Sequence, residues 1–138
     1  VGSEMCIRDS AMTLIIKPAL SIILATAWIS ASEFIRNELL FKSYWIEHYS
    51  ALGVTFPSEP VNGAIWGLWS LLFATVIFLL AKKFSLIQTF LISWFAGFVL
   101  MWVVIGNLGV LPFRLLYFAV PLSLLEAFIA SFIVKKLG

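Results

Sequence analysis

Four long stretches almost free of charged side chains constrain this chain more than any other feature. They are 15, 21, 30 and 20 residues long, and they cover 18–32, 61–81, 84–113 and 115–134. A helix needs about 20 apolar residues to cross about 30 Å of hydrocarbon, and three of the stretches satisfy this. Because 62% of the 138 residues are apolar and only 12% are charged, a soluble domain of this size would leave too much apolar surface in water. The sequence therefore predicts an integral membrane protein.

The predicted fold is all-α, an integral membrane bundle of four transmembrane helices. We expect the spans at about 14–35, 62–81, 85–106 and 114–134. The first uncharged stretch is short, so its span has to include Lys17 near one end and Glu33 near the other, with the lysine side chain extended toward the interface. In an alternative interpretation, residues 12–32 are a cleaved signal peptide with Ser30-Ala31-Ser32 as the cleavage site.

The first residues differ from the rest of the chain. Residues 1–10 hold three charged side chains and the only cysteine, Cys6. They resemble a translated sequencing adapter, which makes Met12 the expected native start. We therefore expect residues 1–11 to be a non-native or disordered leader, and residues 12–138 to form a single four-helix domain.

Basic residues in the short loops predict the orientation, because they are enriched on the cytoplasmic side of membranes. With four spans, five lysines fall on one side: Lys17, Lys82, Lys83, Lys135 and Lys136. Arg36, Lys42 and Arg114 fall on the other side. The count favours an orientation with both termini in the cytoplasm. The expected location is a bacterial plasma (inner) membrane, which the chain crosses several times.

The long connection between the first two spans has a helical pattern of its own. Phe41, Trp45, His48 and Leu52 recur at three- or four-residue spacing, which is typical of a helix with one apolar face. We expect a helix at about 38–52 that lies on the outer membrane interface.

Glu126 is the sharpest functional signal, because it lies near the middle of the last span. A charge at this depth costs about 3 kcal/mol on insertion scales, so the acid needs a reason to be there. At 1.5 Å per residue, each other span offers a polar group at a similar depth. The predicted midplane polar site comprises Glu126, Ser123, Ser93, Trp94, Thr26 and Thr75. In one interpretation this site binds and transfers a proton or an ion. In the alternative, Glu126 only hydrogen-bonds to neighbouring helices and fixes their register.

A second polar group is expected nearer the outer surface. Glu33, Arg36 and Asn37 share one helical face, since they are spaced i, i+3 and i+4. Asn107 ends the third span and Arg114 begins the fourth at the same level. This outer cluster predicts either a vestibule for a charged head group or a simple interfacial ion pair with helix caps. We do not expect Arg36 to neutralise Glu126, because about 12 Å of depth separates Glu33 from Glu126.

Small residues form a stripe on the second span, at Gly63, Gly67, Ser70 and Ala74. Such stripes let helix backbones approach closely, either inside the bundle or against a second protein. Besides the lipid bilayer, the expected partners are therefore another membrane protein or a second copy of the chain. The net charge of +2 and the lack of a basic stripe give no indication of nucleic-acid binding.

Enzymatic motifs are not apparent. One histidine and one cysteine do not suffice for a metal centre of these residues, and no catalytic residue, metal site or cofactor is predicted. The leading hypothesis is transport, permeation or sensing through the midplane acid. The alternative is a structural or accessory membrane subunit that associates through its small-residue helix faces.

Two segments carry a resemblance in layout. They are Glu33-Phe34-Ile35-Arg36-Asn37-Glu38-Leu39-Leu40-Phe41 with Trp45, and Pro121-Leu122-Ser123-Leu124-Leu125-Glu126. With the four spans, they make the chain similar to small four-helix bacterial inner-membrane proteins of unknown function. The resemblance implies a fold and a location, and it assigns no functional residue.

Overall fold

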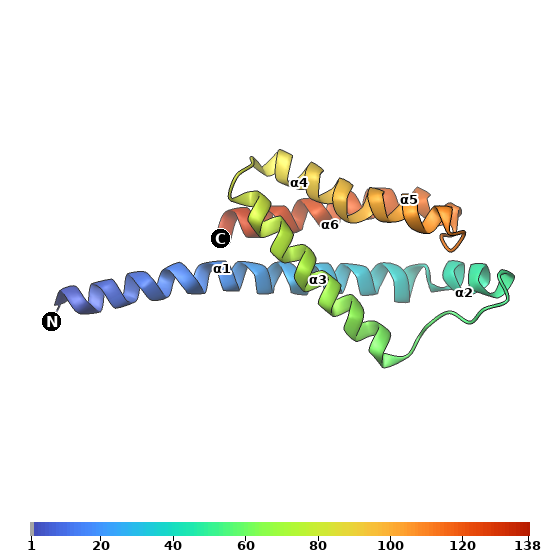
Figure 1. The fold of residues 1–138 in the computed structure, drawn as a ribbon, viewed down its shortest axis with the longest axis horizontal. Coiled ribbons are helices and arrows are strands. Elements are labelled where there is room, and N and C mark those ends of the chain that lie inside the picture. Colours follow the sequence, from blue (N-terminus) through green and yellow to red (C-terminus); the bar gives the residue numbers. More distant parts are fainter. Residues whose placement is uncertain (1) are drawn as a thin grey trace.

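The structure, a computed structural model, describes residues 2–138 and consists of helices joined by turns and by one longer connection at 52–59 (Figure 1). The π-helical segment η1 continues α1, and the π-helical segment η2 joins α4 to α5. The 3-10 turn η3 precedes α6. The elements are α1 Gly2–Phe34, η1 Ile35–Leu40, α2 Lys42–Ala51, α3 Pro60–Ala81, α4 Leu86–Trp94, η2 Phe95–Val99, α5 Leu100–Asn107, η3 Phe113–Leu115 and α6 Leu116–Leu137.

Four continuous helical stretches are long and apolar enough to cross a membrane. They cover Gly2–Leu40, Pro60–Ala81, Leu86–Asn107 and Phe113–Leu137. The prediction of an all-α chain with four such helices is therefore confirmed. The expected spans 62–81, 85–106 and 114–134 lie within three residues of these bounds. The first does not, because α1 begins at Gly2 and η1 extends it to Leu40.

The N-terminal part of α1 projects beyond the other helices (Figure 1). Residues 2–17 are exposed throughout. The expected non-native or disordered leader covers residues 1–11; residue 1 lies outside the described residues, and residues 2–11 form the start of α1. Their non-native origin stays a prediction.

α6 is the central helix of the bundle. It packs against α1, α3 and α4, whereas α3 crosses α1 obliquely and α4 and α5 run beside α6 (Figure 1). The core between these helices is rich in small side chains, and Ala25, Ala74, Ala127 and Ala130 are fully buried. Small residues let helix backbones approach closely, which is how helices associate where burial from water cannot drive them together.

α4 and α6 run antiparallel along a seam of small residues. Two contacts set their register: Trp94 Nε1 donates to Ser123 Oγ at 2.9 Å, and the Phe90 and Phe128 ring centroids are 5.6 Å apart. Beyond the end of α4, in η2, a Cβ added to Gly97 would lie 2.6 Å from the Phe73 ring of α3. Only glycine allows this approach of η2 to α3.

The two ends of the bundle differ. At the end that carries Lys82, Lys83, Lys135 and Lys136, here called the lysine end, Lys135 Nζ donates to the carbonyls of Ala81 and Phe84, each at 2.6 Å. These carbonyls lie at and just after the end of α3, where a cation is favoured. At the opposite end, which we call the α2 end, the His48 Nε2 atom lies 2.7 Å from the Gly109 carbonyl oxygen. Gly109 has a φ of +75°, a conformation that favours glycine.

α2 is shorter than the predicted helix at 38–52. The first residues of the predicted helix belong to η1 instead, and the helical conformation is interrupted at Phe41 before α2 begins. Phe41, Tyr44, Trp45 and His48 are half-buried, and the Phe41 ring stacks on Phe118 at 5.1 Å. Of the predicted apolar face, Phe41, Trp45 and His48 are half-buried, whereas Leu52 is exposed; the placement of the helix on a membrane interface stays a prediction.

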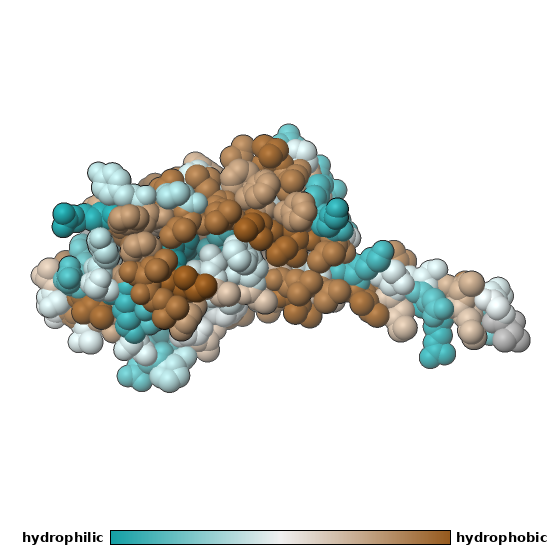
Figure 2. Space-filling view, turned by 180° about the vertical axis from the view of Figure 1, so that it is seen from behind, coloured by the Kyte–Doolittle hydropathy of each residue, from teal (hydrophilic) through white to brown (hydrophobic). Residues whose placement is uncertain are grey.

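Large apolar side chains cover the outside of the bundle. Figure 2 shows them across the middle of the molecule, with hydrophilic residues gathered toward both ends. Leu72 is 57% exposed, Val103 is 65% exposed and Tyr117 is 83% exposed. Soluble monomers rarely expose such a continuous apolar surface, so the surface is suited to a lipid environment.

Candidate functional site

Glu126 lies at the centre of a buried polar network. Its side chain is 0% exposed, on the face of α6 that meets α1. Ser32 Oγ donates to Glu126 Oε2 at 2.8 Å, and Arg36 Nη1 lies 3.2 Å from the same oxygen. Trp28 Nε1 donates to the Glu126 backbone carbonyl at 3.0 Å. Three side chains of the first helical stretch therefore hold one residue of the last.

The spacing along the chain explains why these three side chains converge. Trp28, Ser32 and Arg36 are four residues apart, so they lie one above the other on a single helical face. Ala25 and Ile29 are fully buried beside that face. The same packing that buries these apolar residues turns the three donors toward α6.

Arg36 joins two carboxyl groups. Its Nη2 forms an ion pair with Glu33, and its Nη1 contacts Glu126. The guanidinium carbon also lies 5.3 Å from the centroid of the Phe98 ring, a cation–π distance. Both Glu33 and Arg36 are only 5% exposed. The arginine is thus held by an acid on each side and an aromatic ring.

The network continues toward the α2 end. Asn37 Nδ2 donates to Glu33 Oε2 at 2.7 Å, and Trp45 Nε1 donates to Asn37 Oδ1 at 3.1 Å. We call the connected set the Glu126 network. It consists of Trp28, Ser32, Glu33, Arg36, Asn37, Trp45 and Glu126.

The charges of the network do not balance. Two carboxyl groups share one guanidinium, so full ionisation would leave one negative charge buried. Glu126 Oε1 is buried and has no hydrogen-bond partner among residues 2–138. Glu33 and Glu126 are both paired with the guanidinium of Arg36. An unpaired buried charge is costly, and a proton shared by the two carboxyl groups or a bound cation would remove it.

Both π-helical segments meet at this network. η1 carries Arg36 and Asn37, and η2 carries Phe98. The wider turn of η1 is closed by the Phe41 amide, which donates to the Arg36 carbonyl at 3.0 Å. Isolated π-helical turns in helices are frequent at functional sites, and here the two lie on facing helices around one guanidinium.

The expectation that Arg36 stays apart from Glu126 is wrong. It assumed that all spans start at a common depth, with Lys17 level with the lysines of the other helices. In the structure, Gly138 lies beside Ser21 of α1, so α1 is shifted along the bundle relative to that assumption. Residues 28–36, rather than Thr26, therefore face Glu126.

The predicted midplane site is divided in the structure. Thr26 and Thr75 donate to the carbonyls of Ile22 and Leu71 in their own helices, and both are only half-buried. Ser93 is fully buried but donates to the Thr89 and Phe90 carbonyls. Trp94 and Ser123 bond to each other. None of these five side chains hydrogen-bonds to Glu126.

The predicted outer cluster is brought together only in part. Glu33, Arg36 and Asn37 are joined as their spacing indicated, but Asn107 and Arg114 are exposed. Neither of these two side chains forms a hydrogen bond or an ion pair with residues in the described part of the chain. Asn107 instead borders an open, mainly apolar hollow between α5 and the start of α6, with Trp102 and Phe113 in its wall.

The small-residue stripe of α3 is also divided. Ser70 and Ala74 are fully buried against the bundle. At Gly63 and Gly67, no described atom of another element lies within 4 Å of an added Cβ. α3 leans away from the bundle at its N-terminal half (Figure 1), which leaves room beside both glycines within the described residues.

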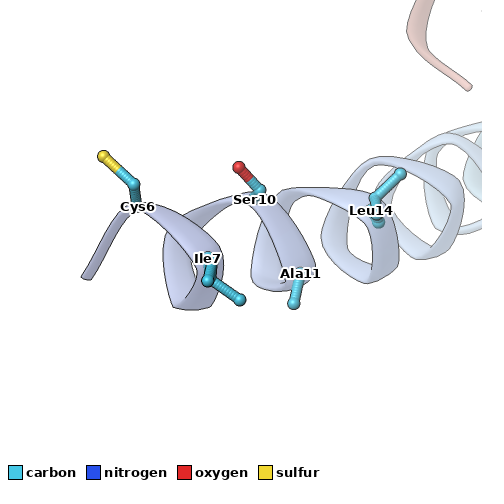
Figure 3. A pocket seen from close by; sticks show the side chains of 5 residues that line it. All are labelled: Cys6, Ile7, Ser10, Ala11 and Leu14. Carbon is cyan, nitrogen blue, oxygen red and sulfur yellow. The ribbon is translucent and has the colours of Figure 1, made fainter. Parts of the chain in front are cut away.

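Another hollow lies on the projecting part of α1 and is unrelated to the network. Cys6, Ile7, Ser10, Ala11 and Leu14 line it. Figure 3 shows that all five side chains come from one helix, with no element opposite them. Such a surface cannot enclose a ligand.

The sites predicted from the sequence omitted Trp28, Ser32 and Trp45 of the Glu126 network, and Phe98 beside it. Ser32 and Trp28 carried a usable signal, because they precede Arg36 at four-residue intervals on an otherwise apolar helix. Phe98 carried none, since it is one of 13 phenylalanines and its position depends on how η2 meets η1.

No family model, curated protein sequence or solved structure matches the chain. The candidate site therefore stands on its own geometry. The layout resemblance to small bacterial four-helix proteins stays a prediction.

Proposed function

We propose that this chain is a multi-pass protein of a bacterial plasma membrane whose Glu126 network takes up a proton in transport, permeation or sensing. Both termini lie on the cytoplasmic side in this proposal. The continuous apolar surface and the four long apolar helices support the membrane location. The lysines gathered at one end support the orientation, because basic residues favour the cytoplasmic side.

One observation carries the proton-binding proposal: two buried carboxyl groups share a single arginine. In a low-dielectric interior, a second negative charge without a cation is strongly disfavoured. A proton on the Glu33–Glu126 pair makes the network neutral and supplies a donor between the two acids. Taking up and releasing that proton is the chemistry that the arrangement supports best.

The substitution Glu126→Gln tests this proposal. It removes the second acid and leaves Glu33 and Arg36 as a balanced ion pair, so the bundle should still fold. In purified, vesicle-reconstituted protein, infrared spectra across a pH titration should contain a protonated-carboxyl band that E126Q lacks. Glu47→Gln is the control, because Glu47 is an exposed acid on α2, and it should leave the band unchanged. A band that persists in E126Q, or no titrating band in the unsubstituted protein, would contradict the proposal.

A second candidate function is supported by the open glycines of α3. Gly63 and Gly67 present a backbone surface with no described neighbour, and small-residue faces of this kind pack against other transmembrane helices. In this candidate the chain is an accessory subunit that binds another membrane protein or a second copy of itself.

The paired substitution Gly63→Leu with Gly67→Leu separates the two candidates. If association uses this face, the pair of leucines should abolish crosslinking between chains in membranes while the monomer keeps its fold. If the chain acts through Glu126 alone, the infrared band and its titration should be unaffected by the leucines.

A further inference from the structure

The Glu126 network is connected by polar contacts to only one end of the bundle. Arg36 pairs with both Glu126 and Glu33. Asn37 Nδ2 donates to Glu33 Oε2 at 2.7 Å, and Trp45 Nε1 donates to Asn37 Oδ1 at 3.1 Å. Asn37 and Trp45 are half-buried, whereas Glu126 is 0% exposed. Polar contacts therefore lead without interruption from the buried acid to partly exposed side chains at the α2 end.

Charged side chains surround the outer members of this chain of contacts. Glu38 follows Asn37 directly, and its carboxyl group pairs with Lys42 Nζ at 2.6 Å. The two side chains of this pair keep 34% and 38% of their surface exposed. Because charged groups are costly in hydrocarbon, such a pair lies where the protein meets water. Asn37 is thus at the level of the aqueous phase of the α2 end.

Toward the lysine end, the same helix interface is apolar. On α1, Ile29 and Ala25 occupy the buried positions one and two turns from Glu33. On α6, Ala130 and Val134 do so one and two turns from Glu126. These four side chains are at most 2% exposed and belong to one core cluster with Ala74 and Ile77 of α3. A closely packed apolar layer therefore separates the network from the lysine end.

The polar side chains in the lysine half do not bridge this layer. Ser131 lies five residues after Glu126, which places it about 140° around α6 from the acid. Ser21 donates to the Pro18 carbonyl of its own helix at 2.8 Å, and Thr89 forms no hydrogen bond with Glu126. From Glu126 to Lys135, nine residues of α6 span about 13.5 Å.

The charges around Glu126 also come from one direction. α3, α4, η2 and α5 contain no charged residue, although α3 and α4 pack against α6. Among the described residues, the charged groups that face Glu126 are therefore Glu33 and Arg36 of the first helical stretch. Both lie on the side of the network that leads to the α2 end.

We propose that the Glu126 network exchanges protons with the solution at the α2 end alone, so that the protein senses the pH of that side and does not carry protons across the membrane. This inference rests on the proposed function and selects sensing among its three alternatives. The proton comes from water at the α2 end and returns there. The apolar layer blocks the other direction, because it offers a proton no hydrogen-bond partner.

The same contacts link the acids to an element that can respond. A proton on the Glu33–Glu126 pair changes the charge that Arg36 meets, and Arg36 lies in η1 next to Asn37. The bond from Trp45 to Asn37 joins η1 to α2. α2 is therefore the element whose position depends most directly on the protonation of the two acids.

The single cysteine allows the direction of exchange to be tested. Cys6 is exposed and lies on the part of α1 that projects past the lysine end (Figure 1). Tethered to a gold surface through this thiol and surrounded by a lipid bilayer, the protein presents its α2 end to the solution. In surface-enhanced infrared spectra, a pH step in the solution should then cause the full change of the protonated-carboxyl band at once. Glu126→Gln should lack the band.

The double variant C6S/S50C reverses the orientation, because Ser50 is an exposed residue of α2. In this variant the lysine end faces the solution, and the same pH step should cause no change of the band. The full change should appear after a proton ionophore equilibrates the two sides of the bilayer. In vesicles that contain a pH-sensitive dye, the unsubstituted protein should pass no more protons than E126Q.

The outcomes distinguish this inference from the proposed function. A prompt band change in both orientations, or only with the lysine end toward the solution, would overturn the one-sided exchange. A proton flux above that of E126Q would overturn it as well, and so would a band that needs the ionophore in both orientations. Absence of a titrating band in both orientations, with the ionophore present, would instead remove the proposed function.

Discussion

α6 and the N-terminal half of α3 carry similar stripes of small residues, yet the structure uses them in opposite ways. On α6, Ala119, Ser123, Ala127 and Ala130 are at most 3% exposed, because three other helices meet along that helix. On α3, a Cβ added to Gly63 or Gly67 would meet no atom of another element among the described residues, because this half of the helix leans away from the bundle. The comparison teaches that a small-residue stripe permits close packing, whereas the crossing of the helix axes decides where packing occurs.

The two regions also differ in what they can hold. The close approach of α6 to α1 encloses Glu126 and lets Ser32 and Arg36 reach it. The open half of α3 exposes mainly apolar side chains and has no charged residue, so it suits another helix better than a charged group. The closely packed face of α6 is therefore also the face that carries the buried polar residue Glu126.

Removing the guanidinium from the α6 region should have the largest effect. Arg36→Met keeps the apolar stem but leaves Glu33 and Glu126 buried without their cation. Breaking a buried ion pair in this way costs about 3–5 kcal/mol, which should appear as a lower unfolding midpoint in detergent micelles. The double variant R36M/E126Q should recover part of the loss. Arg114→Met, at an exposed arginine, should change stability by less than about 0.5 kcal/mol. An R36M protein as stable as the parent would show that the network does not hold α6 in place.

A methyl group added to glycine should reveal the difference between packed and open sites with one identical substitution. Gly97→Ala places its Cβ against the Phe73 ring, which stacks on Trp69 at a centroid distance of 4.9 Å and cannot easily move. Overpacking of this kind costs about 1–3 kcal/mol. Gly67→Ala meets no neighbour and should stabilise the helix by up to about 1 kcal/mol. A lower stability of G97A and a higher stability of G67A in the same unfolding assay would support the contrast between the packed and the open glycine. A loss of stability in G67A would contradict it.

The parts of the structure that depend on local sequence could be predicted. The uncharged stretches predicted three of the four long apolar helices to within three residues, because the length of such a helix follows directly from the number of consecutive apolar residues. The grouping of Glu33, Arg36 and Asn37 could also be predicted, since all three lie within one helical turn.

The pairing between helices could not be predicted from the same information. Thr26 was expected near Glu126, whereas Ser32 and Arg36 occupy that place, because a shift of α1 along its axis changes which residues face α6. Depths counted in residues from the flanking lysines cannot reveal such a shift. The four-residue spacing of Trp28, Ser32 and Arg36 was the only local indication, and it becomes informative once Glu126 is known to need partners.

The i,i+3 ion pair between Arg36 and Glu33 has a consequence for biogenesis. If the chain inserts as proposed, its helices leave the ribosome in order, and the first span would reach the bilayer well before Glu126 has been synthesised. During that interval Arg36 would already be paired with Glu33 of its own helical stretch, which would lower the cost of placing a guanidinium in hydrocarbon. The contact between Arg36 and Glu126 would then form only when the last helix packs against the first.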